Sequence, residues 1–375
     1  MIVQAFLRWA ETARTGDRAR AASALADAFI KSSLGPDEHR AAIMAMTYLL
    51  DDPSPKVRLA LAEALASSDA APRAIIMSLA EDQPEIACTV IACSPVLSDA
   101  DLVELAGRGD SFTRSLVATR PGLGCSAAAA VAEVGDGAEI VLLLENDTAS
   151  VSRITLRRMA QRFGHLADVR HLLLERGNLP ADVRHMLVAH VAAALAGSDL
   201  VTRTIGAKRI DVMTREAGDE AIVAIAGSIF QDEIPLLVEH LKTSGRLTPA
   251  LLIHALCSGK VDFFASAIVS LVHLEERRVR AILATGRVHA VRALFEAAGI
   301  GRDIVTVFVE AVFLWRRAAA GGGIDTCYLA LLERFEGLRG DGGAVGQLLD
   351  MVDLLQRGEL RRSARSYAAD VSLVA

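Results

Sequence analysis

Apolar residues recur at helical spacing along most of the chain, and residues 51–66 give the clearest example. Five positions share the i, i+3, i+4, i+7, i+8 spacing of one helix side, namely Val57, Ala60, Leu61, Ala64 and Leu65. A second apolar stripe of smaller residues comprises Leu59, Ala62 and Ala66. A helix with two apolar sides needs neighbours on both, so this pattern predicts a helix inside a stacked array.

Residues with capping chemistry precede several of these helical stretches. Ser54 can cap the helix that follows it, and Pro55 suits the first helical position, where no backbone donor is needed. Ser98 and Asp101 have the spacing of a capping box, and Thr248 precedes Pro249 as a further cap and first residue. Three more prolines are predicted at first helical positions, namely Pro72, Pro84 and Pro180.

Turns between helices repeat at a nearly constant interval. Asp52, Asp82, Asp110 and Asp136 follow one another at intervals of 30, 28 and 26 residues. A second set of turns lies between them, near Ser68, Pro95, Pro121 and Gly177. A period in the twenties that holds two short helices predicts an α-solenoid, because a single repeat cannot bury its own apolar faces.

The succession of Asp52, Val57-Arg58 and then alanines and leucines resembles the HEAT-like repeat, and also leucine-rich-repeat-variant helical repeats. The resemblance implies an all-α fold, a right-handed α-solenoid of short helix pairs followed by a C-terminal helical domain. Four further segments are similar to a bacterial family known as domain of unknown function 2336. They are Tyr48–Asp52, Leu247–Cys257, Asp262-Phe263-Phe264 and Arg278–Leu283. This family implies helices and brings no established activity.

We expect four parts along the chain. They are an N-terminal helical cap (1–50), a HEAT-like repeat solenoid (51–197), a C-terminal helical domain (198–357) and a flexible basic tail (358–375). Gly197-Ser198-Asp199 marks the main boundary, and the segment Leu200–Gly218, rich in Thr, Arg and Lys, is predicted to form one bridging helix. Runs of alternating β-branched residues, which would predict strands, do not occur.

Composition favours a protein without membrane insertion. The chain is 52% hydrophobic but only 4% aromatic, with a mean hydropathy of +0.35. The most apolar stretches, Phe263–Leu274 and Ile304–Trp315, are each about a dozen residues long and fall short of the roughly 20 that a spanning helix needs. No signal-peptide pattern opens the sequence, and the five cysteines form no CxxC pair, so a reduced, cytoplasmic protein is expected.

Charge is unevenly distributed. Residues 1–150 carry 12 Lys/Arg against 21 Asp/Glu, whereas the remaining residues carry 28 against 25. A protein that binds nucleic acid in a groove typically carries an excess of basic residues along that groove. This chain has no such uniform excess of basic residues. The asymmetry is better suited to orienting a protein partner or a second copy.

The sequence contains no pattern typical of a catalytic, metal or cofactor site. His165 and His171, and likewise His185 and His190, are six and five residues apart, so neither pair shares one helix face. The segment Ser258-Gly259-Lys260 lacks the other residues of a phosphate-binding loop. We therefore predict no catalytic residue, no metal and no cofactor.

Arginines are the strongest polar feature. Arg153, Arg157, Arg158 and Arg162 lie on one predicted helix, Thr148–Gly164, and Arg170, Arg176 and Arg184 follow. The first four are expected to be exposed, away from an apolar stripe of Ile154, Leu156, Met159, Ala160 and Phe163. They can bind an anionic partner, or their stems can cover apolar helix flanks while the guanidinium groups stay in water. A second group comprises Arg277, Arg278, Arg280, Arg287 and Arg292.

Three functions are compatible with these patterns. The leading interpretation is a non-enzymatic adaptor or scaffold whose concave solenoid face binds a protein partner, with Arg153, Arg157, Arg158 and Arg162 as candidate contacts. The second is a nucleic-acid-binding HEAT-like protein that uses the Arg153–Arg184 region. The third is a lyase-like enzyme on a HEAT-like scaffold. The sequence leaves the identity of the partner and the oligomeric state open.

Overall fold

The computed structural model describes residues 2–32, 34–272, 274–321, 326–338 and 342–374, and within them the secondary structure is helical, without strands. The predicted all-α fold is therefore confirmed. Contacts divide the chain into two compact units, Met1–Leu179 and Pro180–Ala375. This division falls earlier than the boundary expected at Gly197, and the four predicted parts remain predictions.

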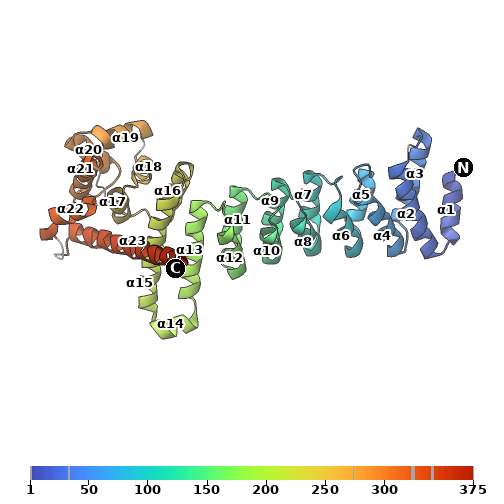
Figure 1. Ribbon diagram of the computed structural model, residues 1–375, viewed down its shortest axis with the longest axis horizontal. Helices are drawn as coiled ribbons and strands as arrows, with labels where there is room; N and C mark the ends of the chain where they lie inside the picture. The colour runs from blue at the N-terminus through green and yellow to red at the C-terminus, as the bar shows by residue number, and fades with distance from the viewer. Residues whose placement is uncertain (1, 33, 273, 322–325, 339–341, 375) are drawn as a thin grey trace. The chain divides into compact units, whose positions relative to one another are not determined.

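The first unit consists of short helices joined by tight turns (Figure 1). Their bounds are α1 Ile2–Thr12, α2 Thr15–Lys31, α3 Pro36–Leu50, α4 Pro55–Leu65, α5 Arg73–Ala80, α6 Pro84–Cys93, α7 Asp99–Arg108, α8 Ser111–Thr119, α9 Cys125–Val134, α10 Gly137–Glu145, α11 Arg153–Phe163 and α12 Ala167–Glu175.

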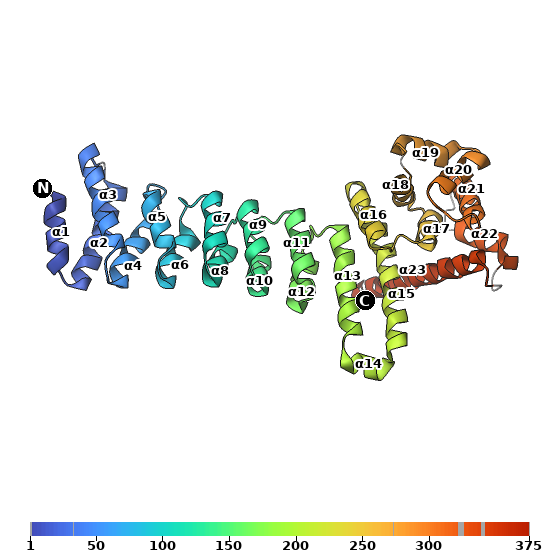
Figure 2. The same cartoon turned by 180° about the vertical axis from the view of Figure 1, so that it is seen from behind.

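Within this unit the helices form two layers, which Figures 1 and 2 show from opposite sides. In one layer each even-numbered helix packs on the next even-numbered helix, from α2 on α4 to α10 on α12. In the other layer α1 packs on α3, α3 on α5, α7 on α9, and α9 on α11. Helix α4 contacts α2 and α6 on its flanks and α3 and α5 on its inner side, with Val57, Leu61 and Leu65 completely buried. The predicted two-sided burial of this helix is confirmed.

Most of the predicted turns and caps are confirmed. Asp110 and Asp136 are the N-cap residues of α8 and α10, and Ser98 and Asp101 form the capping box of α7. Pro55, Pro84 and Pro249 stand at first helical positions.

Three caps differ from the prediction. The side chain of Ser54 makes no capping hydrogen bond; instead its backbone N–H donates to Asp52 Oδ1 at 2.9 Å, so the aspartate holds this turn. Pro72 and Pro180 occupy the N-cap position itself, with extended backbone, one residue before the first helical residue.

The second unit comprises the remaining helices. Their bounds are α13 Ala181–Ala196, α14 Asp199–Ile205, α15 Ala207–Ser228, η1 Gln231–Glu233, α16 Ile234–Thr243, α17 Pro249–Cys257, α18 Val261–Leu271, α19 Glu276–Thr285, α20 Val288–Ala297, α21 Val305–Gly321, α22 Thr326–Arg334, η2 Glu336–Leu338 and α23 Ala344–Val374. Residues 250–257 of α17 are all buried, and α17 packs on α15, α18, α21, α22 and α23.

Two predicted helices and the predicted tail differ from the structure. The expected bridging helix Leu200–Gly218 is broken at Gly206. The backbone φ angle of Gly206 is +89°, which glycine adopts easily and other residues adopt only with strain. Helix α15 begins after this break and continues past Gly218 to Ser228. The helix expected from Thr148 begins at Arg153, because Ser152 caps it by accepting from the Thr155 N–H. Helix α23 runs through the segment expected to be a flexible tail, as far as Val374.

In the described parts of the chain, no single helix has both the length and the apolar character to cross a membrane. Helices α13 and α14 reach these criteria only as a pair, and the pair is bent by 72° at the break between them.

Candidate functional site

Arginine–carboxylate pairs join successive helix pairs of the first unit, and we call each helix pair, from α1–α2 to α11–α12, a repeat. Three of the arginines share one position, the fourth residue of an even-numbered helix, and each reaches a carboxylate that belongs to the next repeat. The pairs are Arg18–Asp52, Arg58–Asp82 and Arg114–Glu139, with N–O distances of 2.7, 2.6 and 3.4 Å. Burial opposes ionisation of Asp52, but hydrogen bonds from Arg18 and from the Ser54 N–H outweigh it, so the pKa of Asp52 is lowered.

The same arginines also bind the turn before their own helix. Arg58 Nη1 donates to the Asp52 carbonyl at 2.6 Å, and Arg18 Nη1 donates to the Ala13 carbonyl at 2.7 Å. Arg170, the fourth residue of α12, donates to the His165 carbonyl at 2.7 Å in the same way. Each guanidinium therefore fixes the start of its helix, and in three cases it also fixes the next repeat.

A second series of hydrogen bonds lies at the opposite, C-terminal ends of the even-numbered helices. Its donors are the C-cap residues that directly follow α8, α10 and α12, namely Arg120, Asn146 and Arg176. Arg120 donates to the Ser94 carbonyl at 2.6 Å, Asn146 to the Ala118 carbonyl at 2.9 Å, and Arg176 to the Leu144 carbonyl at 3.2 Å. Each donor satisfies carbonyls that the end of the preceding even-numbered helix leaves without helical partners.

Two of the four candidate arginines of α11 bind the neighbouring helix α9. Arg158 makes a bidentate pair with the Glu133 carboxylate, with both distances 2.7 Å, and this hydrogen bonding lowers the pKa of Glu133. Arg162 Nη1 donates to the backbone carbonyls of Ala132 and Glu133, both at 2.6 Å. These two side chains therefore tie α11 to α9.

The remaining pair of candidates differs in exposure. Arg153 is exposed and Arg157 is half-buried. The predicted apolar stripe needs one correction, because Ile154 is 79% exposed and Thr155 is buried in its place. Thr155 faces inward because its hydroxyl lies 2.8 Å from that of Ser152 at the start of the helix. Partner binding by the four arginines stays a prediction.

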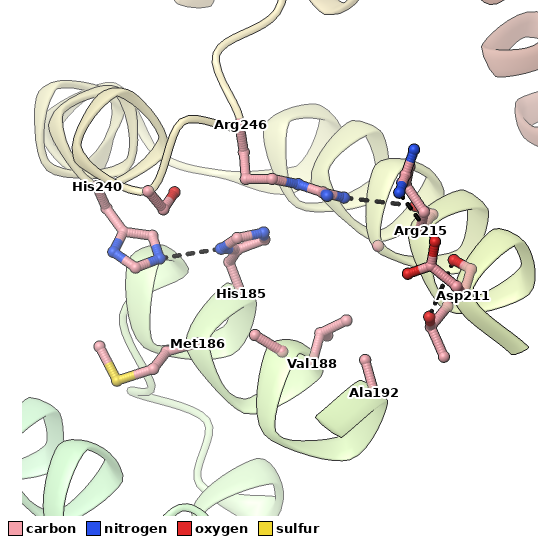
Figure 3. A pocket seen from close by; sticks show the side chains of 12 residues that line it. His185, Met186, Val188, Ala192, Asp211, Arg215, His240 and Arg246 are labelled. Atoms are coloured by element: carbon pink, nitrogen blue, oxygen red, sulfur yellow. Dashed lines mark hydrogen bonds and ion pairs between the residues drawn. The ribbon is translucent and has the colours of Figure 1, made fainter. Parts of the chain in front are cut away.

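The second unit contains a cavity of about 430 Å³ between α13, α15 and α16 (Figure 3). Apolar residues of α13 form one wall, and polar residues of the other two helices and the turn after α16 form the rest. The lining comprises His185, Met186, Val188, Ala189, Ala192, Asp211, Thr214, Arg215, Gly218, His240, Ser244 and Arg246.

Two histidines meet at one end of this cavity. His185 Nδ1 and His240 Nε2 are 2.9 Å apart, and the two rings stand edge to face at 69°. His185 is only 5% exposed. Its burial, together with the nearby His240 and Arg246, lowers the pKa of His185 from 6.5 to about 4. His185 is therefore neutral at physiological pH.

Arg246, from the turn after α16, also lines the cavity. It pairs with Asp219 at 2.9 Å and donates to the Arg215 carbonyl at 3.4 Å. Gly218 makes this position possible, because a Cβ atom there would lie 2.8 Å from Arg246 Nη2. Burial raises the pKa of the Asp219 carboxyl in spite of the neighbouring Arg246.

A buried polar cluster joins α17 to α23. His254, which is 1% exposed, places its Nε2 3.2 Å from Glu359 Oε2, and Ser258 donates to the same Glu359 oxygen at 3.1 Å. The Ser258 hydroxyl is 3.5 Å from His254 Nε2. Serine and glutamate thus meet the same ring nitrogen, whereas a nucleophilic relay needs them on opposite nitrogens. This arrangement cross-links two helices.

A family profile described as "Uncharacterised protein conserved in bacteria (DUF2336)" matches residues 86–343. The chain belongs to the DUF2336 family. The resemblance stated from the sequence is therefore confirmed, and it extends over helices of both units. Searches of curated proteins and of solved structures found no match.

Among the candidate residues of this DUF2336 protein, the structure brings together pairs that the sequence did not indicate. His185 meets His240, 55 positions later, and not the nearby His190. His171 lies on the surface, 3.2 Å from Glu175. Within the described residues no group of three or more His, Cys, Asp or Glu side chains is arranged for a metal ion. The absence of a metal in the working protein stays a prediction.

Substitutions in α11 can show which arginines stabilise the contact with α9. Arg162→Ala is expected to lower the free energy of unfolding by about 1–2 kcal/mol, because two α9 carbonyls lose a charged donor. Arg153→Ala, on the exposed side, is expected to change it by less than about 0.5 kcal/mol. Urea unfolding of the two variants measures the difference. Equal losses would contradict the assignment of Arg162 to the contact between helices.

Proposed function

We propose that this DUF2336 protein is a non-enzymatic adaptor of the cytoplasm, in which residues 1–179 form a right-handed α-solenoid that binds a protein partner. The two-layer order of the helices and the hydrogen bonds that join each repeat to the next support this proposal. Such contacts hold the repeats in fixed register, and a stack of repeats offers a continuous surface for a partner.

One observation carries the proposal, namely the acidity of the open side of the even-numbered helices. Helices α4, α6, α8 and α10 have neighbours on both flanks and on the inner side, and α12 has α10 on one flank and α11 on the inner side, so the opposite side of each helix faces solvent. Its exposed acidic residues are Glu63 on α4, Glu85 on α6, Glu145 on α10, and Asp168 and Glu175 on α12, and the exposed Lys56 on α4 offsets one of these charges. A row of carboxylates attracts a basic protein segment and repels the phosphates of nucleic acid.

The nucleic-acid alternative depends on the Arg153–Arg184 region, and contacts inside the protein weaken it. Arg158 and Arg162 bind α9, whereas Arg170 and Arg176 donate to backbone carbonyls. These guanidinium groups would have to leave their partners to contact phosphates. The enzyme alternative depends on a reactive cluster, and the best polar cluster, at His254, lacks the geometry of a relay.

Charge reversal of the acidic row tests the proposal. A triple variant, Glu85→Lys, Glu145→Lys and Glu175→Lys, is expected to bind a captured protein partner about tenfold or more weakly than the unchanged protein. The partner is first captured from a bacterial lysate and identified, and its affinity is then titrated in purified form at two salt concentrations.

Matched controls reverse exposed acids elsewhere in the same unit. Asp37→Lys and Glu104→Lys are expected to keep the affinity within about twofold, because α3 and α7 belong to the other layer. Equal weakening by controls and triple variant would refute the assigned surface. A salt-dependent DNA gel shift that Arg153→Ala and Arg157→Ala abolish would favour the nucleic-acid alternative instead.

A further inference from the structure

Helices α13, α14 and α15 form a hairpin whose end exposes apolar residues. Helix α14 lies across the far ends of α13 and α15 and packs on both (Figure 1). Exposed large apolar residues gather along these three helices, and they are Val191, Leu195, Leu200, Ile205, Val212 and Met213. Leu200 on α14 is 77% exposed. An apolar group of this size on one projection indicates a docking surface.

Cationic side chains lie on the same helices as these apolar residues. Arg203 on α14 and Lys208 and Arg209 at the start of α15 are exposed, and in the described part of the chain they make no ion pair with a carboxylate. Asp211, the acid closest to them on α15, is paired with Arg215 at 3.0 Å. Asp199, in the first turn of α14, is the exposed acid of that helix, so the three cations give the end of the hairpin a net positive charge next to apolar surface.

The second half of α13 contributes a wall of small and apolar residues. From Val191 to Ala196 it carries no polar side chain, and all of these residues are exposed or half-buried. A helix segment that is apolar all round is usually covered by protein or lipid. The bend of 72° between α13 and α14 turns the chain back before it reaches a spanning length. The hairpin is suited to lie at a surface and not to cross it.

We propose that the end of the α13–α15 hairpin docks on the surface of an anionic lipid bilayer. Leu200 and Ile205 would enter the boundary between headgroups and acyl chains, and Arg203, Lys208 and Arg209 would bind the anionic headgroups. A bilayer offers both an apolar layer and negative charge. The acidic row of a second copy's residues 1–179 offers negative charge, but the exposed large apolar residues on the helices of that row are few, namely Phe112 on α8 and Leu174 on α12. This surface belongs to the second unit and does not depend on the proposed adaptor function.

Vesicle sedimentation of the full chain tests this proposal. The protein is expected to sediment with vesicles that contain phosphatidylglycerol and to stay in solution with pure phosphatidylcholine vesicles, and salt should weaken the binding. The triple variant Arg203→Gln, Lys208→Gln and Arg209→Gln is expected to lose about tenfold or more in vesicle affinity. The pair Leu200→Ser and Ile205→Ser should lose a similar factor through its apolar contacts.

Control variants match these changes elsewhere on the protein. The first control removes the same charge elsewhere through Arg277→Gln and Arg278→Gln in α19 and Arg287→Gln directly before α20, all at exposed positions. The second control, Ile154→Ser, removes an exposed isoleucine from α11. Both controls should keep the vesicle affinity within about twofold. Circular dichroism checks that each variant is folded.

Three results would overturn the proposal. They are the absence of binding to anionic vesicles, binding that the hairpin variants leave unchanged, and a self-association in light scattering that the hairpin variants abolish. The last result would assign the hairpin to a contact between two copies of the chain.

Discussion

Leu61→Asp is expected to prevent the first unit from folding. Leu61 is 0% exposed in α4, between α2 and α6, so the substitution buries a carboxylate without a partner. Burying such a charge costs several kcal/mol, which is comparable with the whole stability of a typical domain. In the full chain we expect either insoluble protein or a marked loss of helical circular dichroism.

Lys56→Asp, on the exposed side of the same helix, is the matched control for this substitution. It introduces the same carboxylate in the first turn of α4, where negative charge suits the helix dipole, and should melt close to the unchanged protein. If Leu61→Asp also melted normally, the buried face of α4 would be assigned to the wrong side.

Acidification is expected to destabilise the second unit through His185. The pKa of this side chain is about 4 in the folded protein and 6.5 as the unperturbed value. Between these values the unfolded chain binds more protons than the folded one, so stability falls as the pH drops from about 6.5 towards 4. His185 alone should lower the free energy of unfolding by about 2 kcal/mol between pH 8 and pH 5.

Urea unfolding at a series of pH values measures this effect. His185→Gln, which keeps a polar side chain but does not titrate, should flatten the decline between pH 6.5 and 4. His171→Gln, at an exposed position on α12, is the matched control for the loss of a histidine side chain. A decline that persists in His185→Gln would mean that other groups cause the acid sensitivity.

Local features of the fold could be predicted from the sequence because they depend on neighbouring residues. The stripe around Leu61, the turns at Asp110 and Asp136 and the capping box at Ser98 each involve residues within one helix or turn. Gly206 shows the limit of such reasoning. Helical spacing continues on both sides of it, and only its positive φ reveals that α14 and α15 are separate helices.

The polar contacts of the candidate sites could not be predicted, because they join residues from different helices. Arg58 and Asp82 are 24 positions apart, and His185 and His240 are 55 apart. Each residue alone is compatible with an exposed position, and only the packing of helices decides its partner. For this reason the sequence identified Arg158 and Arg162 as candidate surface contacts but not Glu133 as the partner that holds Arg158.

The direction of the contacts between repeats has a consequence for synthesis on the ribosome. Arg18, Arg58 and Arg114 find their carboxylates in the repeat that follows, and the carbonyls at the end of α8 receive their donor from Asn146 at the end of α10. A repeat that has just emerged therefore lacks its partners until the next repeat has also been made. Because domains generally fold from the N-terminus during synthesis, each newly made repeat completes the one before it, and the growing end always carries one unfinished repeat.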